Sequence, residues 1–387
     1  MHAARRIMQL SDEDLLRLNV LLANPIEAIR VDDQNMTVYG LCGEQEAVVR
    51  LKPTGHPDQY LRRVRELLSG HVLGSPGGYP AFLQRWTRMG QARDARLAEL
   101  LLLGEPEAVV AVAGAAGLTD ELARRAWWAL PTPEIARCML AREQVVNGRI
   151  GKVLAAYLVD YLPFETEPLS IIATVRLVLQ PGLVDENTRR RIWEKGRSKN
   201  IYHLGFLEST PDALPEEVAA RGDFEQQRAV LDPLVRAGNE YAALLLRMLG
   251  CQGQGFLAVS ERILRKPASQ EAAVGIMNVI GSYFRGSASL ADMPRDMNAV
   301  IERARARYED AAQGPADAGP LAQLVGVVPD LEREIVAVLA LSYVSETLLN
   351  PIFSHTTAVG TVMARKMQPL VGPILELYAV LRMAAAG

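Results

Sequence analysis

Apolar residues recur at helical spacing along most of the chain. Two stretches show the pattern most clearly, residues 57–70 and residues 149–162. In the first, five apolar side chains fall on one stripe: Tyr60, Leu61, Val64, Leu67 and Leu68. In the second, seven fall at i, i+3, i+4, i+7, i+8, i+11 and i+12: Ile150, Val153, Leu154, Tyr157, Leu158, Tyr161 and Leu162. Such periodicity is typical of amphipathic helices that bury one face, so the pattern predicts a mainly α protein.

A short region near the N-terminus follows the β pattern instead. Three apolar runs, at about 27–31, 36–42 and 46–52, are separated by the turn-forming segments 32–35 and 43–45. They predict a small antiparallel meander, which needs a helix packed against it because so small a sheet is marginal alone. Ser11, followed by acidic residues, predicts the N-cap of a helix that precedes the meander.

Proline and glycine divide the rest into helices of roughly 12–17 residues with short connections, which indicates stacked helical hairpins. No side-chain pattern recurs at one period, so an irregular HEAT-like array and a bundle both remain open. We expect an N-terminal helix and meander over 1–56, a helical array over 57–285 and a C-terminal helical bundle over 286–387. Segments 286–294 and 314–320, rich in Gly and Pro, are the candidate linkers.

Composition narrows the class of protein without naming a function. Of 387 residues, 49% are hydrophobic and 22% charged, and the net charge of −3 gives no global attraction to nucleic acid or anionic lipid. Three widely separated cysteines form no C-x-x-C pair, which favours a reducing compartment. The N-terminus lacks the apolar core of a secretory signal, and apolar runs stay below the roughly 20 residues of a membrane span. We therefore expect a cytoplasmic protein.

The glycine-rich stretch from Ser69 to Gln91 allows two interpretations. Its glycine N–H groups can hold an anion or a partner with help from nearby arginines, the candidates being Gly74, Gly77, Gly78, Arg85 and Arg88. Its spacing matches neither the Walker nor the Rossmann glycine pattern. The simpler interpretation is a helix C-cap at Gly70 or Gly74, then a turn and a new helix. An enzyme with an unrecognised site would be sought first near residues 70–80.

The most basic stretch, residues 189–199, carries six cations against one acid. They are Arg189, Arg190, Arg191, Lys195, Arg197 and Lys199, interleaved with Trp193. Such a pattern suits contact with RNA phosphates and stacking on bases. The alternative is a solvated helix face in which Trp193 is buried and Glu194 pairs with Arg190 or Arg197.

The adjacent tryptophans Trp127 and Trp128 fall about 100° apart on a helix. One of them, if exposed, would be a protein-docking anchor, whereas both would be core residues in the simpler interpretation. Signatures of catalysis, metal binding and cofactor binding are missing from the sequence, so we expect no catalytic, metal or cofactor residues. Cys138 fits a buried structural thiol better than a nucleophile, and Glu165 and Glu167 fit an acidic helix start better than a catalytic pair.

Several whole segments resemble one known family. They include "LLRLNVLLAN", "IRVDDQNMTVYGL", "ELLSGHVLGSPGGYPAFLQRWTRMGQ", "FETEPLSIIATVRLVLQPGL" and "WEKGRSKNIYHLGFL", and the similarity covers residues 11–210. The family is DsrS, from the gene cluster of the reverse-acting dissimilatory sulfite reductase of sulfur-oxidising bacteria. The resemblance implies a soluble cytoplasmic protein with an accessory or regulatory role in sulfur oxidation and no assigned catalytic or cofactor residues.

These observations give three hypotheses about function. The first is a non-enzymatic accessory protein of sulfur oxidation that acts by binding a protein partner. The second is an RNA-binding regulator that uses residues 189–199. The third is an enzyme with a site near residues 70–80.

Overall fold

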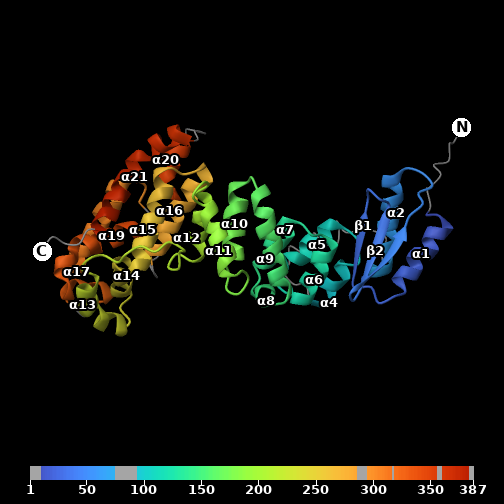
Figure 1. Ribbon diagram of the computed structural model, residues 1–387, viewed down its shortest axis with the longest axis horizontal. Coiled ribbons are helices and arrows are strands. Elements are labelled where there is room, and N and C mark those ends of the chain that lie inside the picture. Colours follow the sequence, from blue (N-terminus) through green and yellow to red (C-terminus); the bar gives the residue numbers. More distant parts are fainter. Residues whose placement is uncertain (1–9, 75–93, 286–293, 316–317, 355–359, 383–387) are drawn as a thin grey trace. The chain divides into compact units, whose positions relative to one another are not determined.

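The chain is mainly helical, with a small three-stranded antiparallel sheet near the N-terminus, as the sequence pattern predicts (Figure 1). The computed structural model describes residues 10–74, 94–285, 294–315, 318–354 and 360–382. Contacts group the chain into two units. The N-terminal unit comprises Met1–Pro163 with Gln180–Val184, and the C-terminal unit comprises Phe164–Leu179 with Asp185–Gly387. The division at residues 56 and 285 that we expect from the sequence stays a prediction.

The described elements of the N-terminal unit are three strands, a series of helices and a 3₁₀ turn that begins at its end. They are α1 (Asp12–Leu22), β1 (Ala28–Asp32), β2 (Thr37–Cys42), β3 (Gln45–Arg50), α2 (Pro57–Leu73), α4 (Asp94–Leu100), α5 (Pro106–Ala113), α6 (Asp120–Ala129), α7 (Pro133–Leu140), α8 (Glu143–Val146), α9 (Ile150–Tyr161) and the 3₁₀ turn Leu162–Phe164. All three predicted strands are therefore confirmed, to within two residues at each end.

The sheet has the order β1-β2-β3, so β2 is central and the other two are edge strands. Ala28 lies opposite Leu41 in the first pair of strands, and Val38 lies opposite Val49 in the second. One face of the sheet packs against α1 and α2 in a continuous core. That core consists of Leu18, Leu21, Ile29, Val38, Val49, Leu51, Tyr60, Leu61, Val64 and Leu68. The predicted stripe on residues 57–70 is thus the side of α2 that covers the meander.

A buried carboxylate joins α1 to the sheet and to α2. Asp14 is fully buried, and its Oδ2 accepts hydrogen bonds from the Lys52 amide at 2.8 Å and from the Tyr60 hydroxyl at 2.5 Å. Ser11 caps α1 by accepting from the Asp14 amide at 3.2 Å, which confirms the predicted N-cap. Burial, together with the hydrogen bond to Asp14, raises the pKa of Tyr60. The network fixes the entry of α1 onto the sheet.

Helix α9 buries less of its apolar stripe than the periodicity predicts. Ile150, Leu154 and Leu158 are buried, whereas Val153 is 50% exposed and Tyr157 is half-buried. The stripe is wider than the surface covered by α7, α6 and α8, the helices of the N-terminal unit that pack against α9. The residues at its edge therefore stay accessible.

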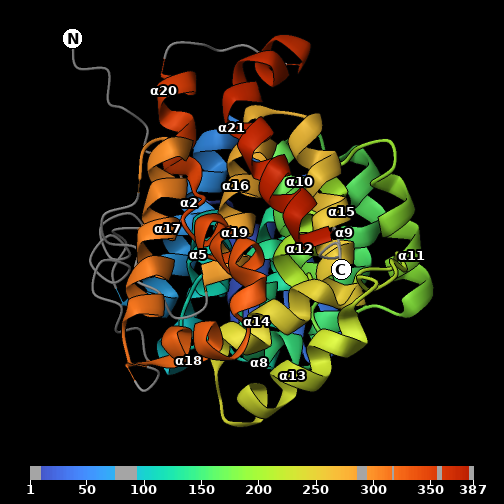
Figure 2. The ribbon, with the colours of Figure 1, turned by 90° about the vertical axis from the view of Figure 1, so that its left-hand side faces the viewer.

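The described elements of the C-terminal unit are helices and 3₁₀ turns. They are α10 (Pro168–Val178), α11 (Glu186–Lys195), α12 (Ile201–Ser209), α13 (Phe224–Arg236), α14 (Glu240–Leu249), α15 (Cys251–Arg265), α16 (Gln270–Arg285), α17 (Met297–Gln313), α18 (Pro320–Val327), the turn Pro329–Leu331, α19 (Glu332–Ser342), the turn Glu346–Leu349, α20 (Asn350–Phe353) and α21 (Gly360–Arg382). Successive helices pack against each other from α13 to α16, and α19 packs against α16, α17 and α21 (Figure 2).

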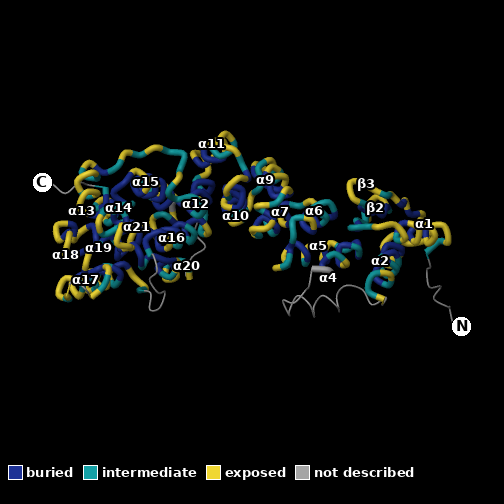
Figure 3. Tube along the Cα trace, turned by 90° about the horizontal axis from the view of Figure 1, so that it is seen from below, coloured by how far each residue is buried: buried dark blue, intermediate teal, exposed yellow. Residues whose placement is uncertain are grey.

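The core of the C-terminal unit lies among α14, α15, α16, α19 and α21, each of which contributes buried residues (Figure 3). Aromatic rings fill its centre: Phe256 stacks on Tyr283 with ring centroids 3.7 Å apart, and both meet Phe284 edge-on. Helix α19 is buried along nearly its whole length, as its almost uniformly apolar sequence predicts. This rigid centre positions α16, whose outer face forms the site described next.

Candidate functional site

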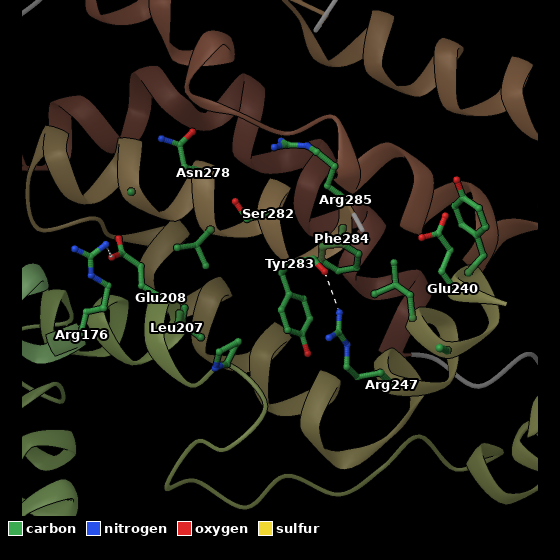
Figure 4. A pocket seen from close by; sticks show the side chains of 16 residues that line it. Arg176, Leu207, Glu208, Glu240, Arg247, Asn278, Ser282, Tyr283, Phe284 and Arg285 are labelled. Carbon is green, nitrogen blue, oxygen red and sulfur yellow. Dashed lines mark hydrogen bonds and ion pairs between the residues drawn. The ribbon is translucent and has the colours of Figure 1, made fainter. Parts of the chain in front are cut away.

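A groove of about 790 Å³ runs along one face of α16 in the C-terminal unit (Figure 4). Its floor includes Gly275, Asn278, Ser282 and Arg285, which recur at i, i+3, i+7 and i+10 and so share one side of the helix. The other lining residues come from α10, α12, the segment after α12, α14 and α16 itself. They are Arg176, Leu207, Glu208, Pro211, Glu240, Tyr241, Ala243, Leu244, Arg247, Val279, Tyr283 and Phe284.

The groove is long and has small residues at its floor and wall. From Gly275 to Arg285 the helix rises about 15 Å, at 1.5 Å for each residue. Ser282 and Ala243 are small side chains on the floor and the wall of the groove, whereas the Leu204 side chain packs closely against Gly275. Arg176 and Glu208 lie at one end and Glu240 at the other, with Ser282 and Tyr283 between them (Figure 4). The volume lies in the range of pockets that hold small molecules or short peptide segments.

One wall is held by a group of three polar side chains. The hydroxyl of Tyr283 donates a hydrogen bond to Asp212, and burial raises the pKa of Tyr283 strongly. Arg247 reaches the same carboxylate at 3.3 Å and donates to the Tyr283 carbonyl at 3.0 Å, with its guanidinium 4.3 Å from the Tyr283 ring centroid. This group fixes the wall and keeps the Tyr283 hydroxyl protonated, so the tyrosine is a positioning element and a poor base.

At one end of the groove the charge of the Glu208 carboxylate is only partly balanced by a nearby cation. Glu208 lies 3.8 Å from Arg176, and its side chain is mostly buried. Burial raises the pKa of Glu208, and the charge of Arg176 opposes that shift only in part. The pair marks this end as polar and partly desolvated.

Arg285 is a half-buried cation that meets only carbonyl oxygens among the residues described. Its Nε donates to the carbonyl of Ser342 at 3.3 Å, and its Nη2 lies 3.5 Å from the carbonyl of Val344. Burial lowers the pKa of Arg285, and within the described ranges no carboxylate lies within ion-pair distance of it. A guanidinium in this setting gains from a carboxylate that a ligand brings.

The basic stretch 189–199 divides into one structural cation and five exposed ones. Arg189 donates to the Ala213 carbonyl and, at 3.1 Å, to the Thr210 hydroxyl, and its guanidinium lies 5.7 Å from the Phe206 ring centroid. The other five are exposed: Arg190, Arg191, Lys195, Arg197 and Lys199. Trp193 is buried, as the solvated-face interpretation expects.

Two of the exposed cations have carboxylate partners: Glu194 pairs with Arg197, one of the two partners that the sequence suggests, whereas Arg190 lies near Glu186. Arg190 lies 3.8 Å from Glu186, and Arg197 lies 3.0 Å from Glu194. A second pocket, of about 560 Å³, brings Arg262 and Lys266 from α15 beside Arg197. Arg262 pairs with Glu216 in the same pocket, at 2.5 Å, so among the described residues only Lys266 adds an unpaired cation to the basic surface. Sequence spacing could not show this because Arg262 and Lys266 lie more than 60 positions from Arg197.

The same pocket contains the buried His203. Its ring packs on Trp193 with centroids 4.1 Å apart, and its Nε2 lies 3.1 Å from the Trp193 carbonyl oxygen. A carbonyl oxygen only accepts, so Nε2 carries a proton and donates it to this bond. Burial lowers the pKa of His203 to about 4, which keeps the imidazole uncharged near neutral pH.

Both candidate docking tryptophans are half-buried and engaged within the N-terminal unit. Trp127 meets Tyr157 edge-on, with centroids 4.7 Å apart. Trp128 donates its Nε1–H to Glu46, and the guanidinium of Arg30 lies 4.9 Å from its ring centroid. Trp128 therefore joins α6 to the meander.

The glycine-rich candidates lie mostly outside the described residues. Gly77, Gly78, Arg85 and Arg88 all do so. Gly74 is the C-cap of α2, with a left-handed φ of 67° and its amide bonded to the Gly70 carbonyl at 3.1 Å. The helix C-cap interpretation therefore accounts for Gly74.

The surroundings of Cys138 and Glu167 fit structural roles. Burial raises the pKa of the Cys138 thiol, the opposite of what a nucleophilic cysteine requires. Glu167 is the N-cap of α10 with Pro168 following it, which is the acidic helix start that the sequence favours. Over the described residues, no group of three or more His, Cys, Asp or Glu side chains is arranged to hold a metal ion.

No single described helix is both long and apolar enough to cross a membrane. Two pairs of consecutive helices reach the required length and apolar composition only when joined, and each pair is bent: Glu240–Leu249 with Cys251–Arg265 by 71°, and Pro329–Ser342 with Glu346–Phe353 by 77°.

Comparison with known proteins finds no matching family model, curated protein or solved structure. The groove along α16 is the site that sequence reasoning missed, since its residues come from four separate segments and form no local motif.

Proposed function

We propose that this protein is a non-enzymatic accessory protein that binds a segment of another protein in the groove along α16. The observation that carries the proposal is the groove itself, floored by one face of a single helix and walled by α12 and α14. The resemblance to the DsrS family suggests a cytoplasmic partner from bacterial sulfur oxidation. The groove supports binding of a chain segment, and the resemblance supplies the biological setting.

The shape of the groove favours a chain segment over a compact ligand. A floor of about 15 Å accommodates about four or five extended residues at 3.3 Å each, or a short helix. Its lining mixes apolar side chains such as Leu244 and Val279 with polar ones at both ends. Grooves that offer apolar contacts together with polar groups are a recurrent way of recognising peptide segments.

The charges of the groove indicate the chemistry of the segment. Arg176 faces Glu208, and Arg247 faces Asp212, so these two cations are compensated within the chain. Arg285 has only carbonyl partners in the described part of the chain. We therefore expect the bound segment to place an acidic side chain next to Arg285.

The test is affinity purification from native cytoplasm after nuclease treatment. Ser282→Arg fills the middle of the groove, and Glu302→Arg places an arginine on an exposed position of α17 as a matched control. We expect one stoichiometric protein with the wild type and with Glu302→Arg, and its loss with Ser282→Arg. Equal recovery with both variants would contradict binding in the groove.

A second candidate function is RNA binding by the basic surface. It is favoured by the five exposed cations of residues 190–199 and by the neighbouring Lys266. The test is the salt dependence of single-stranded RNA binding by wild type and by a variant with Arg190, Arg191 and Lys195 changed to Ala. RNA contact through these cations predicts that the slope of log affinity against log salt falls by about 2. An unchanged slope would contradict RNA binding by this surface.

An enzyme site near residues 70–80 stays a prediction of the sequence alone.

A further inference from the structure

Strand β3 is an edge strand with an outward-facing row of backbone groups. In an antiparallel sheet, alternate residues direct their N–H and C=O groups to opposite sides of the strand. The Leu51 amide donates to the Met36 carbonyl at 2.8 Å, so Leu51, Val49 and Ala47 face β2. The alternate residues Glu46, Val48 and Arg50 therefore direct their backbone groups away from the sheet.

The opposite edge confirms this alternation. On β1 the outward-facing residues are Ile29 and Val31, and the Ile29 amide donates to the Leu101 carbonyl at 2.8 Å. The edge at β1 is thus partly covered by the chain that follows α4. Across the described ranges, no hydrogen bond reaches the backbone groups of Glu46, Val48 or Arg50. An open strand edge is a template for pairing with another strand.

The side chains along this edge are exposed and carry opposite charges at their two ends. Val48 is 52% exposed, and Arg50 is exposed with no ion-pair partner among the residues described. Glu46 uses one carboxylate oxygen, Oε1, to accept from Trp128 and to face Arg30 at 3.7 Å. The second carboxylate oxygen of Glu46 remains available for a partner.

We propose that β3 pairs antiparallel with β3 of a second copy of this chain, about a twofold axis at Val48. Val48 then lies opposite Val48 of the second copy, and Glu46 lies opposite Arg50 at both ends. Each of these pairs exchanges two main-chain hydrogen bonds, because all three residues face outward. The two three-stranded sheets become one continuous sheet across the dimer.

The residues along the β3 edge are complementary to the same residues in a second copy of this chain. Only the register centred on Val48 pairs all three outward residues with outward residues of the other strand. A shift by two residues would place Glu46 opposite Val48 and leave Arg50 beyond the strand. The centred register makes two opposite-charge pairs and one β-branched pair, the combinations that stabilise neighbouring strands.

The test is sedimentation of the full-length protein over a range of concentrations, with three kinds of variant. Val48→Pro removes an outward amide that no described residue uses, so the sheet keeps its own hydrogen bonds. Arg50→Glu places like charges opposite each other in the dimer. Arg305→Glu makes the same charge change at an exposed position of α17 and is the matched control.

We expect a reversible dimer for the wild type and for Arg305→Glu. Both edge variants should raise the dimer dissociation constant by at least about tenfold, since lost main-chain bonds or like charges oppose strand pairing. Mixing Arg50→Glu with Glu46→Arg should restore association, because each chain then meets the opposite charge. A second readout is amide exchange, in which the amides of Glu46, Val48 and Arg50 slow with rising concentration while that of Val49 does not change. A wild type that stays monomeric, or edge variants that dimerise like the control, would overturn the proposal.

Discussion

The guanidinium of Arg221 is completely buried and lies 2.8 Å from the carboxylate of Glu334. The same guanidinium makes two hydrogen bonds to Asp223, at 2.6 and 2.7 Å. Arg221 precedes α13 and Glu334 lies in the first turn of α19, so this ion pair ties two distant segments of the C-terminal unit together. A charge held this way is stable only while its partners remain.

Removing Glu334 should therefore destabilise the C-terminal unit. We expect Glu334→Ala to lower the free energy of unfolding by about 2 kcal/mol, because the buried Nη1 of Arg221 loses its hydrogen bond to Glu334 while Asp223 still balances the charge. Glu332→Ala, at an exposed position two residues before Glu334, should change it by less than about 0.5 kcal/mol. Urea unfolding monitored by circular dichroism measures both. Equal effects would show that the buried pair contributes no specific stability.

His203 predicts a pH dependence of stability with a definite sign. The folded pKa of about 4 lies below the usual value near 6.5, so the unfolded chain binds a proton that the folded chain refuses. Stability is intact above about pH 6.5, declines as the pH falls toward 4, and loses about 3 kcal/mol in total from this group.

The matched variant for this prediction is His203→Gln, which keeps a donor for the Trp193 carbonyl and cannot become charged. It should unfold with a smaller loss of stability between pH 7 and pH 5 than the wild type. Titration of His203 by NMR gives its pKa directly. A pKa near 6.5 would contradict the buried, neutral imidazole.

Arg30 and Trp128 should be energetically coupled. The guanidinium lies 4.7 Å from the Tyr39 ring centroid and 4.9 Å from that of Trp128, so it is held between two aromatic faces. We expect a coupling of about 1 kcal/mol in a double-mutant cycle of Arg30→Met and Trp128→Leu, from the unfolding free energies. Additive effects would show that Arg30 does not stabilise the position of Trp128, and the ring would then be available to a protein partner.

Neighbouring arginines of the basic stretch should differ in their effect on stability. Arg189→Ala removes hydrogen bonds to Thr210 and Ala213 and should cost about 1–2 kcal/mol. Arg190→Ala removes an exposed cation with a long contact to Glu186 and should change stability by less than about 0.5 kcal/mol. Thermal unfolding compares the two. A large loss from Arg190→Ala would contradict its solvated position.

The sequence predicts local elements well because their signals are local. Periodicity places Tyr60 and Val64 on the buried side of α2, and alternation around Val49 sets the third strand. Even the difference between Arg189 and Arg190 has a sequence signal: Arg189 precedes the buried Trp193 by four residues and so shares its face of the helix.

The groove along α16 could not be predicted in this way. Arg176, Arg247 and Arg285 are separated by tens of residues, and only the packing of α10, α12, α14 and α16 brings them to one site. The open edge of β3 is an intermediate case. The sequence predicts the strand, but which of its backbone groups face outward depends on the register with β2.

The most direct test of the central claim, that the groove holds a segment of another protein, is site-specific photo-crosslinking. A photoreactive residue at Ser282 lies on the floor of the groove, and one at Glu302 on α17 serves as control. The account predicts one crosslinked protein from native cytoplasm at position 282, joined through a segment that carries an acidic residue. Arg285→Met should reduce that crosslink, and position 302 should give none. Equal crosslinking from both positions, or crosslinking at 282 that Arg285→Met leaves unchanged, would contradict the account.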